Sequence, residues 1–248
     1  MAVLWQLDSA GTRYEVRSHG ATRRLFSDGV FHSAWNPRTG LTGRAWDLFL
    51  AAAFTRSTPP ARILVLGIGA GTALLQYRRF IDPVTLIGVD LDAVHIEVGR
   101  EFFGLDASGA QLHEADARDW VAAWRGPPFD LVVDDLYSHR DGEPQRAVPM
   151  NGHWARALSR LVAPGGVLAA NFISGGELQA SAQLRTAQAR KAFAAGFRLQ
   201  GPRDHNVVGV FCRSAASAAA TRTRLRAIPQ LDDRRSGGGL RYAMRRLW

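Results

Sequence analysis

Long apolar runs are missing from this sequence, and none approaches the roughly 18 residues that a membrane-spanning helix requires. Cysteine is nearly absent as well, because Cys212 is the only one, and this excludes an internal disulfide. The segment from Met1 to Asp8 has neither the basic nor the apolar region of a signal peptide. A Walker loop with its lysine and a Gly-x-Ser-x-Gly elbow are also lacking. These absences predict a cytoplasmic protein without a P-loop or a serine-hydrolase elbow.

The charge is unbalanced, with 31 lysines and arginines against 22 aspartates and glutamates, which gives a net charge of +9 at pH 7. Such a charge favours phosphate-bearing partners when it is gathered on one face. Here it is scattered and almost entirely arginine, with Lys191 the single lysine, so we expect neither a nucleic-acid nor a membrane partner. Arginines gather mainly near the C-terminus, around the glycines at 237–239 and again at Arg245 and Arg246. We expect a poorly ordered end there, with a flexible arm or docking peptide as the alternative.

The chain divides into three parts by its pattern of residues. Residues 1–40 alternate polar and apolar positions between turn signals such as Asp28-Gly29, which predicts a small β appendage. Residues 41–213 form the main domain and begin with a helical spacing over 41–54. Residues 214–248 form a basic C-terminal helix or tail.

Strands and helices alternate through the main domain. The expected strands are 63–66, 84–89, 111–114, 129–133, 167–172, 197–200 and 207–212. The expected helices are 72–80, 93–103, 120–124, 153–161 and a long one over 177–195. This order predicts an α/β protein with a mostly parallel sheet and helices on both faces. In such sheets a ligand lies at the carboxyl ends of the strands, so those ends are the candidate site.

A glycine-rich loop follows the first of these strands, with glycines at Gly67, Gly69 and Gly71. Glycine allows positive φ and lets a ligand approach the bare backbone beside the free N–H groups of a helix start. The spacing is GxGxG, whereas the dinucleotide fingerprint places its third glycine where this chain has Thr72. The loop is therefore a candidate nucleoside-binding segment, with a tight structural turn as the alternative.

Acidic residues follow the next two strands. Asp90, beside Leu91, lies 23 positions after Gly67, where a carboxylate accepts hydrogen bonds from ribose hydroxyls. Asp92 in that segment is a candidate helix N-cap. Asp116 follows the third strand and is a candidate acceptor for the exocyclic amine of adenine, with Ala117 flanking the ring. The alternative for Asp116 is a cap on the short helix after it.

Two adjacent acids, Asp134 and Asp135, follow the fourth strand. A carboxylate in that place fixes or deprotonates an amine nucleophile, or stabilises a cationic acceptor. Alternate residues of a strand point to opposite sides, so one acid of the pair is expected to face the site. We expect that acid to be Asp134, and capping of the following loop by both is the alternative.

Together these segments resemble the class I S-adenosylmethionine-dependent methyltransferase fold and, within it, the spermidine synthase (polyamine aminopropyltransferase)-like branch. The resemblance extends over roughly residues 24–212 and includes 27–33, which is similar to the family's Asp-Gly-x-x-Gln segment. It implies a Rossmann-like fold with a mostly parallel seven-stranded sheet, helices on both faces and a small N-terminal β appendage. It also implies that Asp90 holds the ribose, Asp116 the adenine amine, and that Asp134 is the catalytic aspartate.

The chain also departs from that family at the expected site. His32 stands where the family has glutamine, and residues 36–46 contain no tyrosine or glutamate, although polyamine synthases have both there. Counted from Asp134, Tyr137 takes the place of the second aspartate in the family's Asp-Ser-x-Asp motif. Because a diamine dication requires several carboxylates to offset its desolvation, these differences argue against spermidine synthesis. His32 and Tyr137 remain candidate catalytic residues beside Asp134.

The sequence therefore predicts a transferase that uses S-adenosylmethionine to methylate a small-molecule acceptor. The alternative is aminopropyl transfer from decarboxylated S-adenosylmethionine, and a second alternative is a non-catalytic nucleoside- or RNA-binding module. No pair of histidines has the spacing of metal ligands, so no metal is expected. The sequence leaves a homodimer open.

Overall fold

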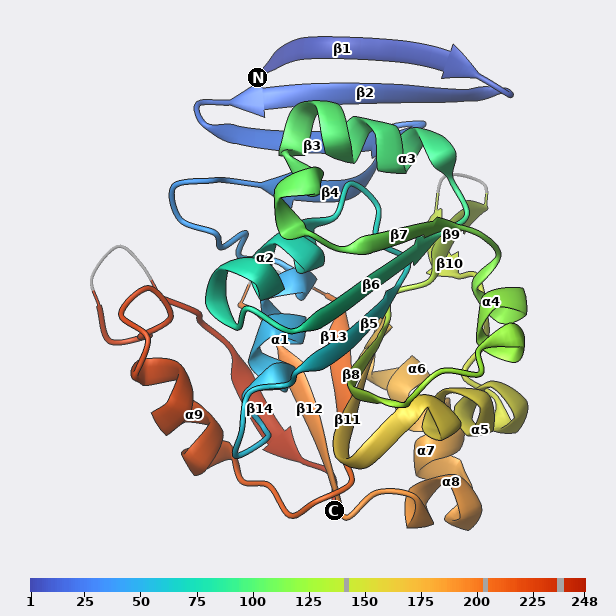
Figure 1. The fold of residues 1–248 in the computed structure, drawn as a ribbon, viewed down its shortest axis with the longest axis vertical. Coiled ribbons are helices and arrows are strands. Elements are labelled where there is room, and N and C mark those ends of the chain that lie inside the picture. The colour runs from blue at the N-terminus through green and yellow to red at the C-terminus, as the bar shows by residue number, and fades with distance from the viewer. Residues whose placement is uncertain (141–142, 203–204, 236–238) are drawn as a thin grey trace.

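The computed structural model describes residues 1–140, 143–202, 205–235 and 239–248. A small antiparallel sheet from the N-terminus stands at one end of the molecule, beyond a larger sheet that is flanked by helices (Figure 1). The α/β class, the mostly parallel sheet and the N-terminal β appendage that the sequence predicts are confirmed.

The N-terminal sheet is a simple antiparallel meander. Its strands are β1 (Ala2–Ser9), β2 (Thr12–His19), β3 (Thr22–Ser27) and β4 (Val30–Trp35), paired in that order. The turn between β3 and β4 has positive φ at both Asp28 and Gly29, as the commonest two-residue hairpin turn requires. Buried side chains of this sheet, including Val16 and Leu25, pack against the segment around Phe103. The sheet is thereby fixed to the main domain.

The main sheet has eight strands within the described residues. In spatial order they are β14 (Ala243–Arg246), β12 (Ala195–Gln200), β13 (Val207–Cys212), β11 (Val162–Phe172), β8 (Phe129–Asp134), β5 (Arg62–Leu66), β6 (Thr85–Asp90) and β7 (Gln111–Glu114). The strands from β11 to β7 are parallel to their neighbours, while β13 runs antiparallel to both β11 and β12. The strand order reverses between β5 and β8, which is where such sheets bind ligands.

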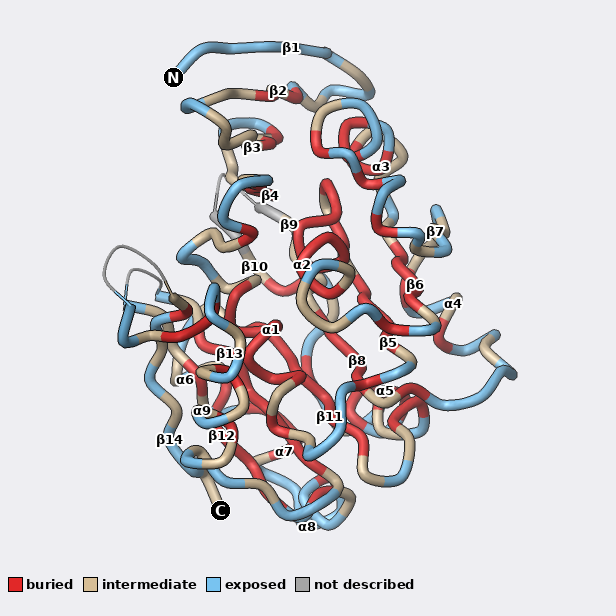
Figure 2. Tube along the Cα trace, turned by 60° about the vertical axis from the view of Figure 1, so that its left-hand side comes forward, coloured by how far each residue is buried: buried red, intermediate tan, exposed pale blue. Residues whose placement is uncertain are grey.

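Helices cover both faces of this sheet, and alternate strand residues face each layer. Ile63 and Val65 pack into one core with α1 (Ala45–Ala53) and α2 (Thr72–Phe80). Leu64 and Val132 pack into another with α4 (Ala117–Ala123) and α5 (Gly152–Leu161). Figure 2 shows how the buried residues concentrate along the strands between the two layers. The remaining elements between β6 and α5 in the chain are α3 (Ala93–Val98), a π-helical turn (Gly99–Phe103), a 3-10 turn (Leu105–Ser108) and the hairpin of β9 (Tyr137–Arg140) and β10 (Glu143–Arg146).

Two elements differ from the sequence prediction. The long helix expected over 177–195 is wrong, because the segment forms α6 (Gly175–Ala180), α7 (Ala182–Arg185) and α8 (Ala187–Lys191). Ser181 and Thr186 are extended and interrupt the helix, and the Thr186 hydroxyl accepts the N–H of Ala189 to start the last turn. Short polar side chains compete in this way with a continuous helix.

The C-terminal end, which the sequence predicts to be poorly ordered, forms regular structure in the residues that the structure describes. After α9 (Ala218–Arg226), residues 243–246 form β14 and pair with β12, adding an eighth strand. The ring of Trp248 stacks on Phe211, with 5.9 Å between their centroids. The tail therefore completes the sheet and covers its last antiparallel strands. In the described part of the chain, no helix is both long and apolar enough to span a membrane.

Candidate active site

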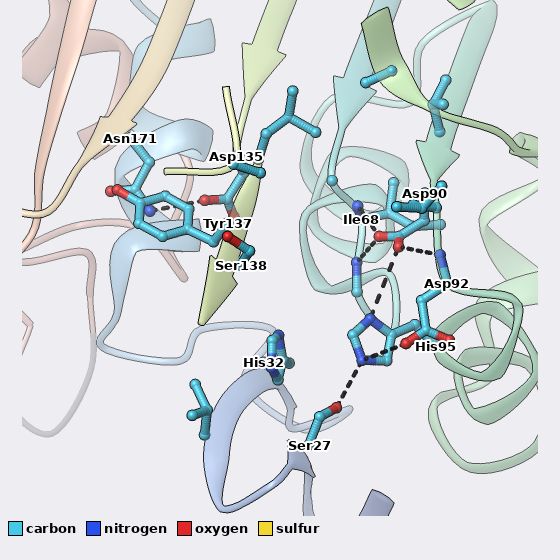
Figure 3. Close-up of a pocket in the computed structure, with 18 of the residues that line it drawn as sticks. Ser27, His32, Ile68, Asp90, Asp92, His95, Asp135, Tyr137, Ser138 and Asn171 are labelled. Atoms are coloured by element: carbon cyan, nitrogen blue, oxygen red, sulfur yellow. Dashed lines mark hydrogen bonds and ion pairs between the residues drawn. The ribbon is translucent and has the colours of Figure 1, made fainter. Parts of the chain in front are cut away.

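A cleft of about 620 Å³ lies between the N-terminal sheet and the carboxyl ends of β5, β6 and β8 (Figure 3). One end, the β6–β7 end, is lined by Asp90, Leu91, Asp116 and Ala117. The other, the β8–β11 end, is lined by Asp135, Tyr137, Ser138 and Asn171. The predicted site residues that line this cleft are His32, Gly67, Gly69, Asp90, Leu91, Asp116, Ala117 and Tyr137. Gly71 and Asp134, which were predicted with them, are not among its lining residues.

The glycine loop requires its first two glycines for steric reasons. Gly67 has φ of +80°, and a Cβ there would overlap the carbonyl oxygen of Asp135. Gly69 has φ of +52°, and a Cβ would lie 2.6 Å from the hydroxyl oxygen of Ser33 on β4. Gly71 instead starts α2, where a Cβ would overlap the side chain of Leu105. The loop therefore fits closely between β4 and the end of β8. Gly71 leaves room for the side chain of Leu105 to pack against the start of α2.

Asp90 fixes the shape of this loop from the end of β6. Its Oδ2 accepts the backbone N–H groups of Ile68 and Gly69, both at 2.8 Å, and its Oδ1 accepts the N–H of Asp92 at 3.0 Å. Burial raises the pKa of Asp90, while the nearby His95 and the backbone N–H groups oppose that rise. Each carboxylate oxygen has two lone pairs. Oδ1 accepts one backbone N–H, so it retains the capacity to accept a hydrogen bond from a ligand hydroxyl. Leu91 beside it is 70% exposed and gives this wall an apolar surface.

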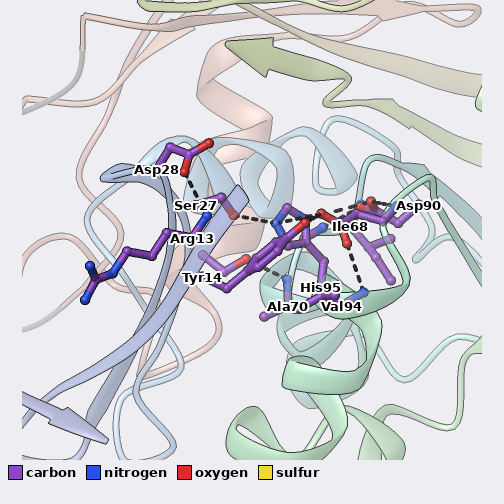
Figure 4. A network of polar contacts seen from close by, with 12 residues as sticks. Arg13, Tyr14, Ser27, Asp28, Ile68, Ala70, Asp90, Val94 and His95 are labelled. Carbon is purple, nitrogen blue, oxygen red and sulfur yellow. Dashed lines mark hydrogen bonds and ion pairs between the residues drawn. The ribbon is translucent and has the colours of Figure 1, made fainter. Parts of the chain in front are cut away.

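Polar contacts connect the N-terminal sheet to this end of the cleft (Figure 4). The Tyr14 hydroxyl on β2 donates to Asp92 Oδ2 at 2.8 Å, and Ser27 Oγ on β3 is hydrogen-bonded to His95 Nε2 at 2.9 Å. Asp92 Oδ1 also accepts the N–H of Val94 at 2.9 Å, so the predicted N-cap is confirmed. Burial and the neighbouring Asp92 raise the pKa of Tyr14 to about 12. The β appendage is therefore part of the cleft wall.

Asp116 lies at the start of α4. Its Oδ1 accepts the N–H of Arg118 at 2.7 Å, so it caps this helix, and the Arg118 guanidinium pairs with the same carboxylate. The hydrogen bond from Arg118 lowers the pKa of Asp116. The side chain of Asp116 is 25% exposed and borders the cleft. Capping therefore occurs here, and binding of adenine by the same carboxylate stays a prediction.

The expectation that Asp134 enters the cleft is wrong. Its side chain is fully buried on the α5 side of the sheet, where Oδ2 accepts Arg146 Nη2 at 2.6 Å and Trp154 Nε1 at 3.0 Å. The reason is the alternation along β8, because Val132 already faces α5 and Asp134 is two residues further on. Arg146 is also hydrogen-bonded to the carbonyl oxygen of Asn171. This buried ion pair attaches β10 to the sheet.

Of the adjacent pair Asp134 and Asp135, Asp135 is the acid that lines the cleft. It follows β8 directly, and its Oδ1 accepts Asn171 Nδ2 at 2.8 Å, while Asn171 Oδ1 accepts Asn206 Nδ2 at 3.2 Å. Burial raises the pKa of Asp135 to about 7, and the hydrogen bond from Asn171 opposes the rise. A carboxyl group with that pKa is poised to exchange a proton near neutral pH. The β8–β11 end of the cleft therefore contains a candidate general base.

Tyr137 and His32 border the same region, as Figure 3 shows. The Tyr137 hydroxyl is buried and has no hydrogen-bond partner in the described part of the chain. Burial, and then the charge of Asp135, raises the pKa of Tyr137. The ring centroids of His32, on β4, and His95 are 4.8 Å apart. His32 lies between the two ends of the cleft. A buried hydroxyl without a protein partner retains the capacity to hydrogen-bond a ligand or a water molecule at this place.

Asn171, Asn206 and Arg146 are not among the residues that the sequence predicts for this site. Asn171 is near the carboxyl end of β11, as the acidic residues are on their strands, whereas Asn206 precedes the amino end of β13 and reaches the same edge because β13 is antiparallel to β11. The position of Asn171 at a strand's carboxyl end is visible in the sequence, but that of Asn206 depends on the antiparallel pairing of β13. Arg146 belongs to the β9–β10 hairpin, for which no strand was expected. Among the described residues no cluster of histidine, cysteine and carboxylate side chains fits a metal ion.

Comparison with known sequences gives partial matches, and no family model matches the chain. Over 92 residues the chain is 28% identical to polyamine aminopropyltransferase 2 of Caldanaerobacter subterraneus subsp. tengcongensis, covering 36% of this chain and 31% of that protein. Over 118 residues it is 30% identical to the polyamine aminopropyltransferase of Chromobacterium violaceum, covering 47% of this chain and 44% of that one. The matched stretches span less than half of either relative.

Solved structures share the fold over more of the chain. A probable spermidine synthase from Corynebacterium glutamicum superposes with a TM-score of 0.73 at 16% identity, over 99% of this chain and 91% of that one. A spermidine synthase in complex with the transition-state analogue AdoDATO gives 0.68 at 15% identity, over 97% and 81%. Human methyltransferase-like protein 13 in complex with SAH gives 0.57 at 17% identity, over 73% and 87%. The predicted resemblance to the spermidine synthase-like branch and to the class I methyltransferase fold is confirmed.

Proposed function

We propose that this chain is a transferase that moves an alkyl group from the sulfonium of an S-adenosylmethionine-type donor to an amine. The observation that supports this best is Asp135, a carboxyl group with a pKa raised to about 7 at one end of the cleft. The other end has the carboxylates and apolar surface suited to an adenosine group. The donor's reacting carbon would then lie between the two ends.

The donor is proposed to bind along the β6–β7 end. Oδ1 of Asp90 accepts a ribose hydroxyl, and Asp116 accepts the exocyclic amine of adenine. The ring lies against the exposed side chain of Leu91 and against Ala117. In this arrangement the sulfonium points towards Asp135, and Gly67 and Gly69 allow the donor to pass close to the backbone.

The transfer requires one bond to form and one to break. The lone pair of the acceptor nitrogen attacks the carbon beside the sulfonium, the carbon–sulfur bond breaks, and its electrons neutralise the sulfur. The nitrogen becomes cationic as the new carbon–nitrogen bond forms, and it loses a proton to the Asp135 carboxylate. His32 and Tyr137 flank the reacting atoms, and alignment of nitrogen, carbon and sulfur is the main contribution of the protein.

We propose the aminopropyl group as the group transferred, with decarboxylated S-adenosylmethionine as the donor. Support comes from the relatives, which are polyamine aminopropyltransferases. Methyl transfer, the first expectation from the sequence, has no such support, since the methyltransferase neighbour shares only the fold at 17% identity. Both donors have the same adenosine group, so the proposed binding at the β6–β7 end holds for either.

A thermal-shift panel tests the donor site. We expect methylthioadenosine, S-adenosylmethionine and its decarboxylated form to stabilise the protein, because all three contain the adenosine group. At 100 times its dissociation constant a ligand adds about 2.7 kcal/mol to the free energy of unfolding. Asp116→Ala should weaken the binding of all three nucleosides to a similar extent. Stabilisation by NAD alone, with no shift from any of these nucleosides, would contradict the proposal.

A further inference from the structure

His95, on α3, lies at the β6–β7 end of the cleft, although it is not among the residues that the sequence predicts for the site. It is 7% exposed. The centre of its ring is 4.8 Å from that of His32 and 5.9 Å from that of Tyr14, which it meets edge-on. His32 and Tyr14 belong to β4 and β2 of the N-terminal sheet. The imidazole is therefore enclosed between that sheet and the main domain.

The ring nitrogens of His95 connect the N-terminal sheet to two carboxylates of the cleft wall (Figures 3 and 4). Nε2 is hydrogen-bonded to Ser27 Oγ, on β3, at 2.9 Å and lies 3.6 Å from Asp92 Oδ2. Nδ1 lies 3.9 Å from Oδ1 of Asp90, at the end of β6. The two longer distances are those of ion pairs and not of hydrogen bonds. His95 thus contacts β3 and lies within 4 Å of both carboxylates.

Oδ1 of Asp90 is the atom proposed to accept a ribose hydroxyl, so its charge and direction determine how well the donor binds. The N–H of Asp92 holds this atom at 3.0 Å, while the glycine loop holds Oδ2. Burial raises the pKa of Asp90, the charge of His95 opposes that rise, and the negative charge of Asp92 adds to it. Two neighbouring carboxylates favour ionisation of both only when a cation lies near them. His95 occupies the place for that cation.

We propose that His95 is a positioning residue for donor binding, which holds the ribose acceptor Asp90 in place and connects it through Ser27 to the N-terminal sheet. A ribose hydroxyl then meets a carboxylate that is already oriented, so binding loses less free energy to ordering of the site. The transfer is proposed to occur at the β8–β11 end, so His95 should influence donor binding and not the transfer step. This inference rests on the proposed function and names a residue that acts through Asp90.

Replacing His95 with phenylalanine keeps an aromatic ring and removes both nitrogens. We expect His95→Phe to weaken the binding of methylthioadenosine about tenfold, which corresponds to 1.4 kcal/mol. The affinity for adenine, which has no ribose, should be unchanged. The KM for the donor should rise while kcat at saturating donor is retained, as expected when binding alone is lost. Calorimetry measures the nucleoside, and displacement of the nucleoside measures adenine.

A double-mutant cycle assigns the effect to Asp90. In the background of Asp90→Asn, His95→Phe should have little further effect on methylthioadenosine binding, because residues that act through one contact are not additive. His95→Gln supplies an amide nitrogen towards Ser27 and should recover part of the affinity.

His113→Phe is the matched control. His113 lies on β7 and packs against Trp120, with 5.6 Å between the ring centres, and it is not among the residues that line the cleft. The same exchange of imidazole for phenyl there should leave the affinities for methylthioadenosine and adenine unchanged.

The inference is overturned if His95→Phe leaves methylthioadenosine binding unchanged, weakens adenine equally, or adds its full effect to that of Asp90→Asn. In these cases the unmodified protein still binds methylthioadenosine, and the proposed function is unaffected. If the unmodified protein does not bind methylthioadenosine, the proposed function fails and this inference fails with it. If His95→Phe does not fold, Ser27→Ala replaces it in the same comparisons, and an unchanged affinity for methylthioadenosine in that variant overturns the inference.

Discussion

Replacing Asp135 with asparagine is expected to lower turnover by about 10²- to 10⁴-fold, the usual contribution of a general base. The same change should stabilise the protein at pH 8. The pKa of Asp135 rises from 3.8 to about 7 on folding, so ionisation of this carboxyl group disfavours the folded state. Each unit corresponds to 1.36 kcal/mol, so an uncharged asparagine should recover on the order of a few kcal/mol. Lost activity with gained stability is the signature of a strained catalytic group.

The pH dependence gives this prediction a second readout. The amine must transfer its proton to ionised Asp135, so kcat/KM should rise as the pH increases through about 7. Stability should change in the opposite direction, because a raised acid pKa makes the free energy of unfolding fall between about pH 4 and pH 7 and level off above. Asp135→Asn should abolish both trends. A variant that keeps near-normal turnover would show that Asp135 is not the base.

Replacing Asp134 with asparagine should have the second-largest effect, and that effect is on stability. Arg146 is almost completely buried, and its ion pair with Asp134 is the interaction that balances its charge on this face of the sheet. Removing one partner of a buried pair costs about 3–5 kcal/mol, which for a chain of this size lowers the Tm by roughly 10 °C. Trp154 Nε1 also loses its charged acceptor.

A double variant provides the matched control. Asp134→Leu combined with Arg146→Met removes both charges and fills the space with apolar atoms, so it should be less destabilised than Asp134→Asn alone. Below its melting temperature, Asp134→Asn should retain donor binding, as measured by the shift that methylthioadenosine produces. A variant of Asp134 that loses all turnover without losing stability would instead restore it as the catalytic aspartate.

Much of the fold could be predicted because strand and helix patterns depend on local sequence. The apolar run at 63–66 and the glycines after it locate β5 and the loop, and the acids at strand ends locate most of the cleft wall. The prediction that Asp134, rather than Asp135, faces the cleft is wrong because it depends on which face of β8 packs against α5. Val132 and Trp154 decide that, through packing of α5 that no local pattern reveals.

Other features depend on contacts between distant segments. Asn171 and Asn206 meet Asp135 only because β8, β11 and β13 are neighbours in the sheet. The pairing of residues 243–246 with β12 likewise comes from tertiary structure, since the glycines before this segment suggest a loose end. Ser181 and Thr186 divide an otherwise helical stretch because both residues have an extended backbone.

Identification of the nucleoside product tests the central claim most directly. The protein is incubated at pH 8 with an amine acceptor and either S-adenosylmethionine or its decarboxylated form, and the products are separated and weighed by mass spectrometry. We expect methylthioadenosine together with an aminopropylated amine from the decarboxylated donor, and about 10²- to 10⁴-fold slower formation of both with Asp135→Asn. Formation of S-adenosylhomocysteine and a methylated acceptor, or no nucleoside product from either donor, would contradict the proposed transfer.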